Sequence, residues 1–267
     1  KSQKRYYAKI IAAFEDFAPE GCVHLAGVSS VPRSWTAPYE TIQANVVGTL
    51  NVLDAIRRRP SVRCVVVTSS QIYGEVSSDE PLDETTPARP ATPYAISKAA
   101  ADALALCWAR RYSLPVLTAR PTNHIGPGQS TSFVIASLAL QLARIAEGLA
   151  SPPVRAGNLD SIRDFLDVRD TVRGYRLLLE RGRAGEAYHL ASGREARIAD
   201  LWTQLCEIAG LRPAVEATPE LWRPADRAPR LRWDKIRADT GWMPQIPMTE
   251  TLRAVYDDAR RRVRDGG

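Results

Sequence analysis

The sequence predicts an α/β fold of the doubly wound type, in which helices cover both faces of a parallel sheet. Short, largely apolar runs at 22–26, 63–68 and 115–120, of which 63–68 is strongly β-branched, alternate with segments of helical periodicity. These runs are apolar at nearly every position, as expected for strands that are covered on both faces. Ligands of such sheets bind beyond the carboxyl ends of the strands. The residues there are Ala26-Gly27, Ser69-Ser70 and Pro121-Thr122-Asn123-His124, so we expect a site at this edge.

Helical periodicity fills most of the chain between and beyond these strands. Helices are expected at 4–18, 40–58, 93–112, 131–148, 167–181, 197–209, 234–240 and about 249–264. A further short strand is expected at 187–190. Loops are predicted at 28–39 and 74–93, loop with short extended structure at 150–165, and an irregular covering loop at 212–232.

The composition is that of an ordinary globular protein with a substantial core. Of 267 residues, 45% are hydrophobic and 25% are charged, and no apolar run approaches the length of a membrane span. The net charge of +6 arises from arginines that interleave with acidic residues, as in Asp257-Asp258-Ala259-Arg260. We therefore expect a mixed, solvated surface, a cytoplasmic location, and neither a membrane nor a nucleic acid as partner.

The cysteines and histidines are spaced too widely for a metal site. The four cysteines are expected to be reduced core thiols, at Cys22, Cys64, Cys107 and Cys206. The three histidines are scattered in the same way, at His24, His124 and His189. We expect His124 and His189 to be structural, and we predict no metal cofactor.

One segment combines a helix start with a chemical pair, Thr92-Pro93-Tyr94-Ala95-Ile96-Ser97-Lys98. Thr92 suits the N-cap and Pro93 the first helical position, so Tyr94 and Lys98 should leave one face of the helix that follows. A free phenol has a pKa near ~10, and a nearby ammonium lowers it. Tyr94 would then be a proton donor or acceptor. Taken alone, the pair also fits a surface tyrosine and lysine on an ordinary helix.

This segment is the last of four stretches that occur in the same order as in a known family. Together they resemble the extended short-chain dehydrogenase/reductase family, which modifies nucleotide sugars. They are 24–27 (HLAG), 45–53 (NVVGTLNVL), 68–74 (TSSQIYG) and 93–98 (PYAISK). Two later stretches, 122–134 and 157–170, resemble the GDP-mannose branch of that family, and most of all its GDP-4-keto-6-deoxy-D-mannose reductases. The likeness continues through Arg223-Pro224 and Thr240-Gly241-Trp242-Met243-Pro244.

The glycine-rich turn with which family members begin is not present in this sequence. Members carry a strand and a Gly-x-x-Gly-x-x-Gly turn that holds the cofactor pyrophosphate at a helix N-terminus. At ~30 residues per βαβ unit, about 60 residues would precede the first matching helix. We expect the sequence to be part of a longer chain; in the alternative, a truncated relative, the cofactor cradle would be lacking and catalysis would be in doubt.

The resemblance implies a Rossmann-like cofactor domain at 1–122 plus about 165–192. A smaller nucleotide-sugar-binding α/β domain would comprise about 123–164 and 193–267. In the family, Tyr94 would be the general acid/base, Lys98 its partner and a ligand of the nicotinamide ribose, and Ser69 the hydroxyl that hydrogen-bonds the reacting oxygen. Ser69 also fits a capping or turn serine.

The remaining contacts follow from the same resemblance. The cofactor would contact Leu25, Ala26, Gly27, Thr68, Tyr94, Lys98, Pro121 and Thr122. The substrate would contact Ser70, Gln71, Asn123, Phe133, Val134, Arg163, Arg223 and Asp226. Arg163 suits a pyrophosphate by charge and fork geometry, although it, Asn123, Arg223 and Asp226 could instead be structural. Arg227 and Arg232-Trp233-Asp234 depart from the family pattern, which bears on guanine specificity.

Gln71 discriminates between the reactions of this family. In the 4,6-dehydratases a glutamate at this position removes a proton from the sugar, and a neutral amide cannot accept one. The resemblance therefore implies NADPH- or NADH-dependent reduction of the 4-keto group of a GDP-4-keto-6-deoxyhexose, to GDP-6-deoxy-D-mannose or its C4 epimer. The alternatives are a nucleotide-sugar 4-epimerase or 4,6-dehydratase, or a non-catalytic relative that binds nucleotide sugar. A homodimer through helices 40–58 and 93–112 is expected.

Overall fold

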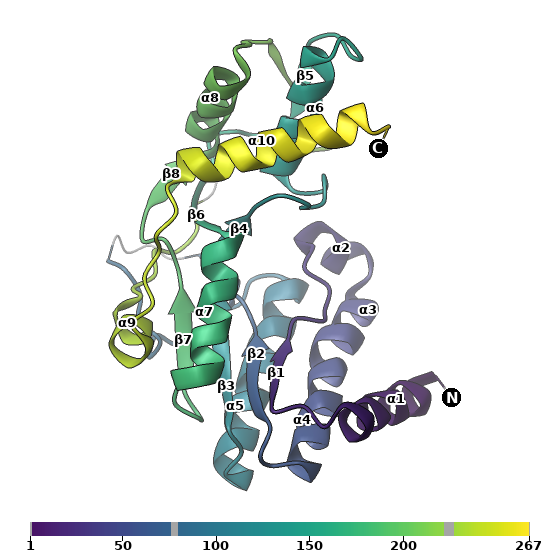
Figure 1. Cartoon of the computed structure of the whole chain (residues 1–267), viewed down its shortest axis with the longest axis vertical. Helices are drawn as coiled ribbons and strands as arrows, with labels where there is room; N and C mark the ends of the chain where they lie inside the picture. The colour runs from purple at the N-terminus through teal and green to yellow at the C-terminus, as the bar shows by residue number, and fades with distance from the viewer. Residues whose placement is uncertain (1, 76–79, 222–226, 267) are drawn as a thin grey trace. The chain divides into compact units, whose positions relative to one another are not determined.

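The computed structural model describes residues 2–75, 80–221 and 227–266 (Figure 1). The chain divides into two compact units. Unit 1 comprises Lys1–Thr122, Val172–Leu190 and Leu231–Met243. Unit 2 comprises Asn123–Thr171, Ala191–Arg230 and Pro244–Gly267.

Unit 1 is built on a four-stranded sheet in which every neighbouring pair of strands is parallel. The strands are β1 (Gly21–His24), β2 (Arg63–Val67), β3 (Val116–Pro121) and β7 (Ala187–Leu190), in the order β1-β2-β3-β7. Val66 of β2 pairs with Thr118 of β3, and Thr118 pairs with Ala187 of β7. The carboxyl ends of β1, β2 and β3 therefore meet at one edge. The predicted doubly wound α/β class is confirmed.

Helices cover both faces of this sheet (Figure 1). On one face, Cys64, Val66 and Val116 form a core with apolar side chains of α4 (Gly48–Arg58) and α5 (Pro93–Tyr112). Helix α1 (Ser2–Phe17) packs on the same cluster through Ile10 and Phe14. Residues 172–181 of α7 (Val168–Arg181) lie on the opposite face. This helix ends so close to β3 that a Cβ at Gly182 would lie 2.8 Å from a Leu117 methyl group.

The segment between β1 and α4 is more helical than predicted. Residues 28–39 were expected to form a loop, but they contain α2 (Val31–Thr36) and the start of α3 (Pro38–Ile42). The Ser30 hydroxyl accepts a hydrogen bond from the Arg33 amide, and a proline lies in the first turn, which together start α2. The long helix expected at 40–58 is interrupted by a π-helical segment, Gln43–Val47, between α3 and α4. π-helical turns of this kind are frequent at functional sites.

Residues 231–243 belong to unit 1, whereas the sequence-based division placed them with 193–267; similarly, 165–171 belong to unit 2. Leu231 forms a bridge with Leu82, and the Arg232 amide donates to the Leu82 carbonyl. Helix α9 (Asp234–Thr240) follows, and then the fully buried Trp242. These contacts fix this segment against the sheet of unit 1, which sequence order alone does not indicate.

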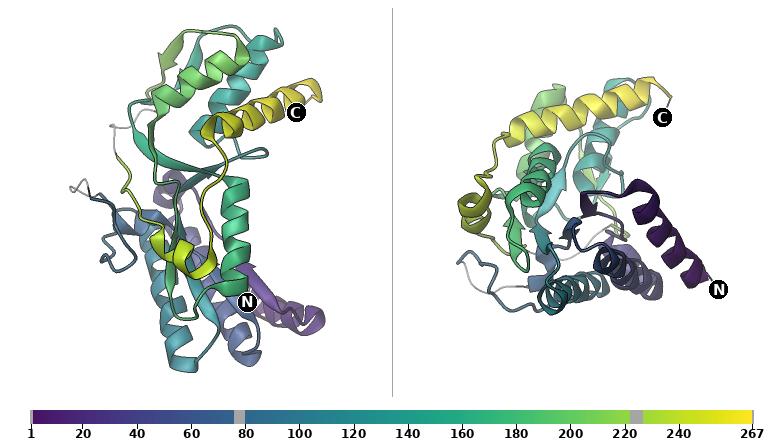
Figure 2. Two further views of the ribbon diagram at one scale, coloured as in Figure 1. Left: turned by 60° about the vertical axis from the view of Figure 1, so that its left-hand side comes forward. Right: turned by 60° about the horizontal axis from the view of Figure 1, so that its bottom comes forward.

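Unit 2 contains a helical layer and two small sheets (Figure 2). Strands β4 (Asn123–Ile125), β6 (Ile162–Asp167) and β8 (Glu195–Arg197) form one sheet, and β5 (Val154–Ala156) pairs with β9 (Val215–Ala217). Side chains from three helices make its core, from α6 (Val134–Ala146), α8 (Ile198–Ala209) and α10 (Met248–Arg264). The parallel pair β5–β9 gives regular structure to a segment that the sequence predicted to be irregular.

The cysteines differ in exposure. Cys64 and Cys206 are buried and Cys22 is partly buried, but Cys107 is exposed on α5, so its assignment to the core was wrong. Within the part of the chain that the structure describes, no cluster of histidine, cysteine, aspartate or glutamate has the arrangement of a metal site. Within the same residues, no helix is both long and apolar enough to span a membrane.

Candidate active site

Ser69 lies directly beyond the carboxyl end of β2. It caps a short 3₁₀ helix, η2 (Ser70–Tyr73), with extended backbone angles, and its Oγ accepts a hydrogen bond from the Gln71 amide at 3.2 Å. The side chain is only 7% exposed. A serine held in this way keeps its hydroxyl hydrogen available for a second partner, because the contact with Gln71 uses only a lone pair.

The helix that carries Tyr94 and Lys98 begins as the sequence predicts. The Thr92 Oγ1 accepts a hydrogen bond from the Ala95 amide at 3.1 Å, and Pro93 occupies the first turn of α5. Tyr94 and Lys98 lie one turn apart and are both buried, at 7% and 8% exposure. Burial of both residues is inconsistent with an ordinary surface tyrosine and lysine.

The buried side chains of Tyr94 and Ser69 are close enough for Ser69 to affect the pKa of Tyr94. Burial raises the pKa of Tyr94 above its usual value, and the hydrogen bond with Ser69 acts in the opposite direction. The predicted net lowering of the Tyr94 pKa was therefore wrong, because the cost of burying a phenolate dominates. Lys98 instead donates to the Val67 carbonyl at 3.0 Å. Burial lowers the pKa of Lys98 to about 8.

A second corner of the site is formed by Gly27, at the end of β1, together with Asn45. A Cβ at Gly27 would lie 2.6 Å from Asn45 Oδ1 and 3.7 Å from Lys98 Nζ. Asn45 Oδ1 accepts from the Val28 amide at 2.7 Å, while Nδ2 donates to the Val28 carbonyl at 3.0 Å and to Ser97 Oγ at 2.8 Å. One buried amide thus fastens the loop after β1 to the helix that carries Tyr94 and Lys98.

Sequence reasoning did not single out Asn45. The signal that could have identified it is an asparagine directly before Val46-Val47-Gly48 in a helical stretch, because asparagine is unfavourable inside helices. It lies in the π-helical segment, 2% exposed. Its three side-chain contacts explain why a polar residue is accommodated there.

His24, at the end of β1, is neutral. Its Nε2 lies 3.1 Å from Thr49 Oγ1. Burial, with a smaller contribution from the charge of Lys98, lowers the pKa of His24 to about 4. The Lys98 ammonium therefore faces a neutral imidazole at neutral pH.

The residues expected at the cofactor fit a dinucleotide at this edge. Leu25, Ala26 and Gly27 are exposed, so the chain is accessible to a ligand there. One N–H of Lys98 is used by Val67, and an ammonium has three, so Lys98 can also donate to ribose hydroxyl groups.

Thr68, Pro121 and Thr122 are buried at the ends of β2 and β3. The Thr68 hydroxyl donates toward Asp102 and the Ala119 carbonyl, so it faces α5 and is already paired. The amide of Thr122 donates to the Leu190 carbonyl at 2.9 Å.

The expected substrate residues lie in both units. In unit 1, Ser70 is buried at the start of η2 and Gln71 is half-buried beside Ser69. In unit 2, Asn123 begins β4, Phe133 precedes α6 with 37% exposure, and Val134 packs on the core of that unit.

Arg163 lies on β6 and is half-buried, with Nη1 donating to the Ile162 carbonyl at 2.9 Å. The expected substrate residues Arg223 and Asp226 lie outside the described residues. Arg227, which departs from the family pattern, forms a two-pronged ion pair with Glu195, with both N–O distances 2.7 Å. The departure at Arg227 therefore has a structural partner within unit 2.

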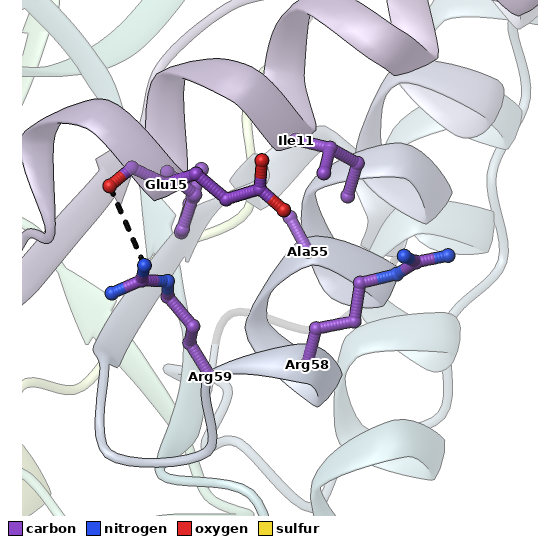
Figure 3. A pocket seen from close by; sticks show the side chains of 6 residues that line it. Ile11, Glu15, Ala55, Arg58 and Arg59 are labelled. Atoms are coloured by element: carbon purple, nitrogen blue, oxygen red, sulfur yellow. Dashed lines mark hydrogen bonds between the residues drawn. The ribbon is translucent and has the colours of Figure 1, made fainter.

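A cavity of about 340 Å³ lies between α1 and α4 and is separate from these residues (Figure 3). It is lined by Ile11, Phe14, Glu15, Ala55, Arg58 and Arg59. Arg59 donates to the Glu15 carbonyl across it, and Arg58 donates to the Tyr7 hydroxyl. Both arginines at its rim are thus engaged in hydrogen bonds within the chain, and none of the residues that line the cavity belongs to the group around Tyr94.

Comparison with known proteins places this geometry in a family. Residues 5–255 match the family model described as GDP-mannose 4,6 dehydratase. The chain is 40% identical to the GDP-6-deoxy-D-mannose reductase of Pseudomonas aeruginosa, over 92% of this chain and 82% of that protein. The chain belongs to the GDP-mannose 4,6-dehydratase family. The predicted membership of the extended short-chain dehydrogenase/reductases is thereby confirmed.

Other members of this wider family are also similar to the chain. It is 31% identical to a dTDP-glucose 4,6-dehydratase of Haemophilus influenzae, over 90% of this chain and 76% of that protein. The structure of RMD from Pseudomonas aeruginosa complexed with NADPH superposes with a TM-score of 0.86 at 39% identity, covering 91% of this chain and 82% of that one. The complex of UDP-glucose 4-epimerase from Thermus thermophilus with NAD gives 0.84 at 30% identity, with 95% and 82% covered.

Proposed function

We propose that this protein is an NADPH- or NADH-dependent reductase of the 4-keto group of a GDP-4-keto-6-deoxyhexose, forming GDP-6-deoxy-D-mannose or its C4 epimer. The observation that carries the proposal is the proximity of Ser69 and Tyr94, one turn from Lys98, in a chain 40% identical to a GDP-6-deoxy-D-mannose reductase. These three side chains provide a hydroxyl pair and a cation at the carboxyl edge of the sheet.

Tyr94 would donate the proton that the reaction needs. Because burial raises its pKa, Tyr94 is protonated at neutral pH and can give its hydrogen to the oxygen at C4. The bound nicotinamide supplies the hydride that adds to C4. Ser69 would donate a hydrogen bond to the same oxygen and stabilise the negative charge that develops on it.

Lys98 would stabilise Tyr94 after the proton has left. A phenolate buried at this site is costly, and the ammonium one turn away offsets that cost through its charge. The same ammonium would bind the nicotinamide ribose, with the exposed backbone of 25–27 and the strand ends at Thr68, Pro121 and Thr122 along the cofactor.

Gln71 supports reduction over dehydration. A 4,6-dehydratase needs a base that removes a proton from carbon, and the side-chain amide of Gln71, two positions after Ser69, cannot accept one. Within the proposal, Gln71 and Ser70 contact the sugar. Asn123, Phe133, Val134 and Arg163, together with Arg223 and Asp226, would bind the rest of the nucleotide sugar. Unit 1 would then hold the cofactor and unit 2 the nucleotide.

The proposal includes a homodimer through α3, α4 and α5. Large apolar side chains are exposed on α3 and α5, at Tyr39, Ile42, Ile96 and Tyr112. Burial of these side chains against a second copy of the chain would stabilise such a dimer. Light scattering at micromolar concentration would detect the dimer, and a monomer would contradict this part of the proposal.

The test is turnover of the purified chain with GDP-4-keto-6-deoxymannose and NADPH, followed by loss of NADPH absorbance and by product analysis. We expect the Tyr94→Phe variant to lose about 100-fold or more in kcat, the usual contribution of a positioned proton donor. Tyr188→Phe is the matched control. Tyr188 is also a buried tyrosine, but it lies on the face of the sheet opposite to α5, where its hydroxyl donates to Asp239. Equal activity of both variants, or no turnover of the wild type, would overturn the proposal.

A further inference from the structure

Behind the Ser69 turn, unit 1 contains a buried polar cluster that the proposed chemistry does not use. We call it the Arg120 cluster; it comprises Thr68, Tyr73, Glu84, Asp102, Arg120 and His189. The other five residues are at most 7% exposed, and the Glu84 side chain is 9% exposed. A polar cluster of this size in a small core is costly unless every member is paired, so the pairing pattern is informative.

The centre of the cluster is a two-pronged ion pair. Arg120 Nε lies 3.0 Å from one oxygen of Asp102, and Nη2 lies 2.6 Å from the other. The hydroxyl of Thr68, directly before Ser69, donates to the same carboxylate at 3.1 Å. Asp102 is one helical turn beyond Lys98 on α5. The ion pair therefore joins β3 to the helix that carries Tyr94 and Lys98.

The remaining nitrogen of Arg120 reaches two other segments. Its Nη1 donates to the Tyr73 hydroxyl at 2.8 Å and to the Glu84 carbonyl at 3.0 Å. Tyr73 is the last residue of η2, the short helix that Ser69 caps. Glu84 belongs to the loop between η2 and α5. One guanidinium thus contacts the end of the Ser69 turn, the loop, and α5.

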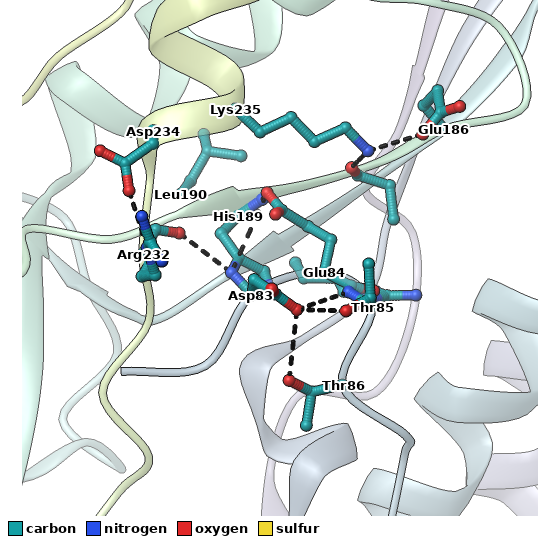
Figure 4. Close-up of polar contacts among 12 residues, drawn as sticks. Asp83, Glu84, Thr85, Thr86, Glu186, His189, Leu190, Arg232, Asp234 and Lys235 are labelled. Carbon is teal, nitrogen blue, oxygen red and sulfur yellow. Dashed lines mark hydrogen bonds and ion pairs between the residues drawn. The ribbon is translucent and has the colours of Figure 1, made fainter. Parts of the chain in front are cut away.

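His189 fixes the direction of the two hydrogen bonds at the Tyr73 hydroxyl, and Figure 4 shows its own contact with the Arg232 carbonyl. Its Nδ1 lies 3.0 Å from the Arg232 carbonyl, which can only accept, so Nδ1 carries the proton. Nε2 must then accept from the Tyr73 hydroxyl at 2.6 Å, and Tyr73 accepts from Arg120. Burial, the largest cause, lowers the pKa of His189 to about 3, so this direction holds at neutral pH.

We propose that Arg120, with Asp102 and Tyr73, is a positioning residue that sets the separation between Ser69 and Tyr94. Only the expected change in kcat depends on the proposed function; the expected change in the titration of Tyr94 does not. Without these contacts, nothing in the cluster would couple the far end of the Ser69 turn to α5. Arg120 touches neither reacting group, and it acts through the two segments that carry them.

A stabilising role alone does not account for the cluster. Replacing a buried ion pair by apolar residues is often neutral or stabilising, so such a pair is weak evidence for a contribution to stability. Its geometry is better suited to holding β3 and α5 in one relative position, because the planar Arg120 guanidinium makes two parallel hydrogen bonds with the Asp102 carboxylate in one orientation only. Displacement of a reacting group by about 1 Å can cost 100-fold in rate.

The first experiment compares Tyr73→Phe with Tyr188→Phe. Both remove one buried phenol hydroxyl with two hydrogen-bond partners, since Tyr188 donates to Asp239 and accepts from the Arg183 amide. We expect Tyr73→Phe to lower kcat about tenfold with KM values within twofold of the wild type, and Tyr188→Phe to retain wild-type kcat. Equal kcat in the two variants, at matched losses of thermal stability, would overturn the proposal.

The second experiment does not depend on turnover. NMR of ring-¹³C-tyrosine protein, with the signal of Tyr94 assigned from Tyr94→Phe, reports when Tyr94 titrates. Because the Ser69 hydrogen bond acts to lower the pKa of Tyr94, its loss should move the titration to higher pH in Tyr73→Phe and not in Tyr188→Phe. An unchanged titration in Tyr73→Phe would overturn the positioning role, whereas a wild type without turnover would overturn the proposed function alone.

Discussion

Lys98 and Asp102 lie one turn apart on α5 and are both buried, but they differ in how many hydrogen bonds their charged groups make. Lys98 Nζ donates to a single main-chain carbonyl, that of Val67. Asp102 receives two hydrogen bonds from Arg120 and a third from Thr68. Burial lowers the pKa of Lys98 to about 8, whereas Asp102 shares its charge with a guanidinium.

The difference separates two uses of a buried charge. The Lys98 ammonium has N–H donors left for partners outside the chain. Because it is buried with a single carbonyl partner, its pKa is lowered. The Asp102 carboxylate is held on both oxygens, so it has little capacity for a ligand and instead fixes the distance between segments. Substitutions at the two positions should therefore affect different properties of the protein.

The largest expected effect on stability is that of Asp102→Asn. Removing one partner of a buried ion pair leaves the Arg120 charge uncompensated, and we expect a loss of about 3–5 kcal/mol in the free energy of unfolding. Urea titration measures it. Asp200→Asn is the matched control, because Asp200 pairs with Arg197 at the surface of unit 2, with both side chains about half exposed.

At Asp200 the expected loss is below about 1 kcal/mol, as for surface ion pairs in general. If Asp102→Asn cost no more than Asp200→Asn, the Asp102–Arg120 pair would not be a fixed buried contact in solution. The contrast with Lys98 would then disappear.

The next effect is that of Lys98→Met, which should reverse the pattern. We expect kcat to fall about 100-fold, because Tyr94 loses the cation that stabilises its phenolate. Stability should stay the same or rise, since a methionine of similar length removes a buried charge that has a single carbonyl partner. Stopped-flow or steady-state NADPH oxidation and urea titration of one preparation give both values. A loss of stability comparable to that of Asp102→Asn would contradict the comparison.

The sequence contained the parts of this site that depend on local spacing. Thr92, Tyr94 and Lys98 follow from an N-cap and an i,i+4 pair, whereas the choice of Ser69 rests on the family resemblance together with its place after an apolar strand. The predicted fold class is confirmed for the same reason, because strand and helix periodicities are local signals. The start and end of α5, 93 and 112, agree with the prediction.

The parts that the sequence did not reveal depend on contacts between distant residues. Tyr73 and His189 are 116 positions apart, and nothing near either residue indicates the other. The grouping of residues 231–243 with unit 1 likewise rests on the Leu82–Leu231 bridge. The direction of the Tyr94 pKa shift could not be predicted either, since it depends on burial, which spacing does not report.

The smallest effect is a change in the pH profile, and it concerns Lys98 alone. With a pKa of about 8, Lys98 carries its charge below pH 8 and loses it above. The quotient kcat/KM for the cofactor reports groups of the free enzyme, so it should be flat below about pH 8 and fall by up to tenfold per unit above it.

Lys98→Arg tests that assignment. A guanidinium stays protonated throughout this range, so the decline near pH 8 should vanish in the variant even though its absolute rate is lower. The same decline in Lys98→Arg would assign the titration to another group. It would also show that the spare hydrogen-bonding capacity of Lys98, which distinguishes it from Asp102, is unrelated to the charge on which the reaction depends.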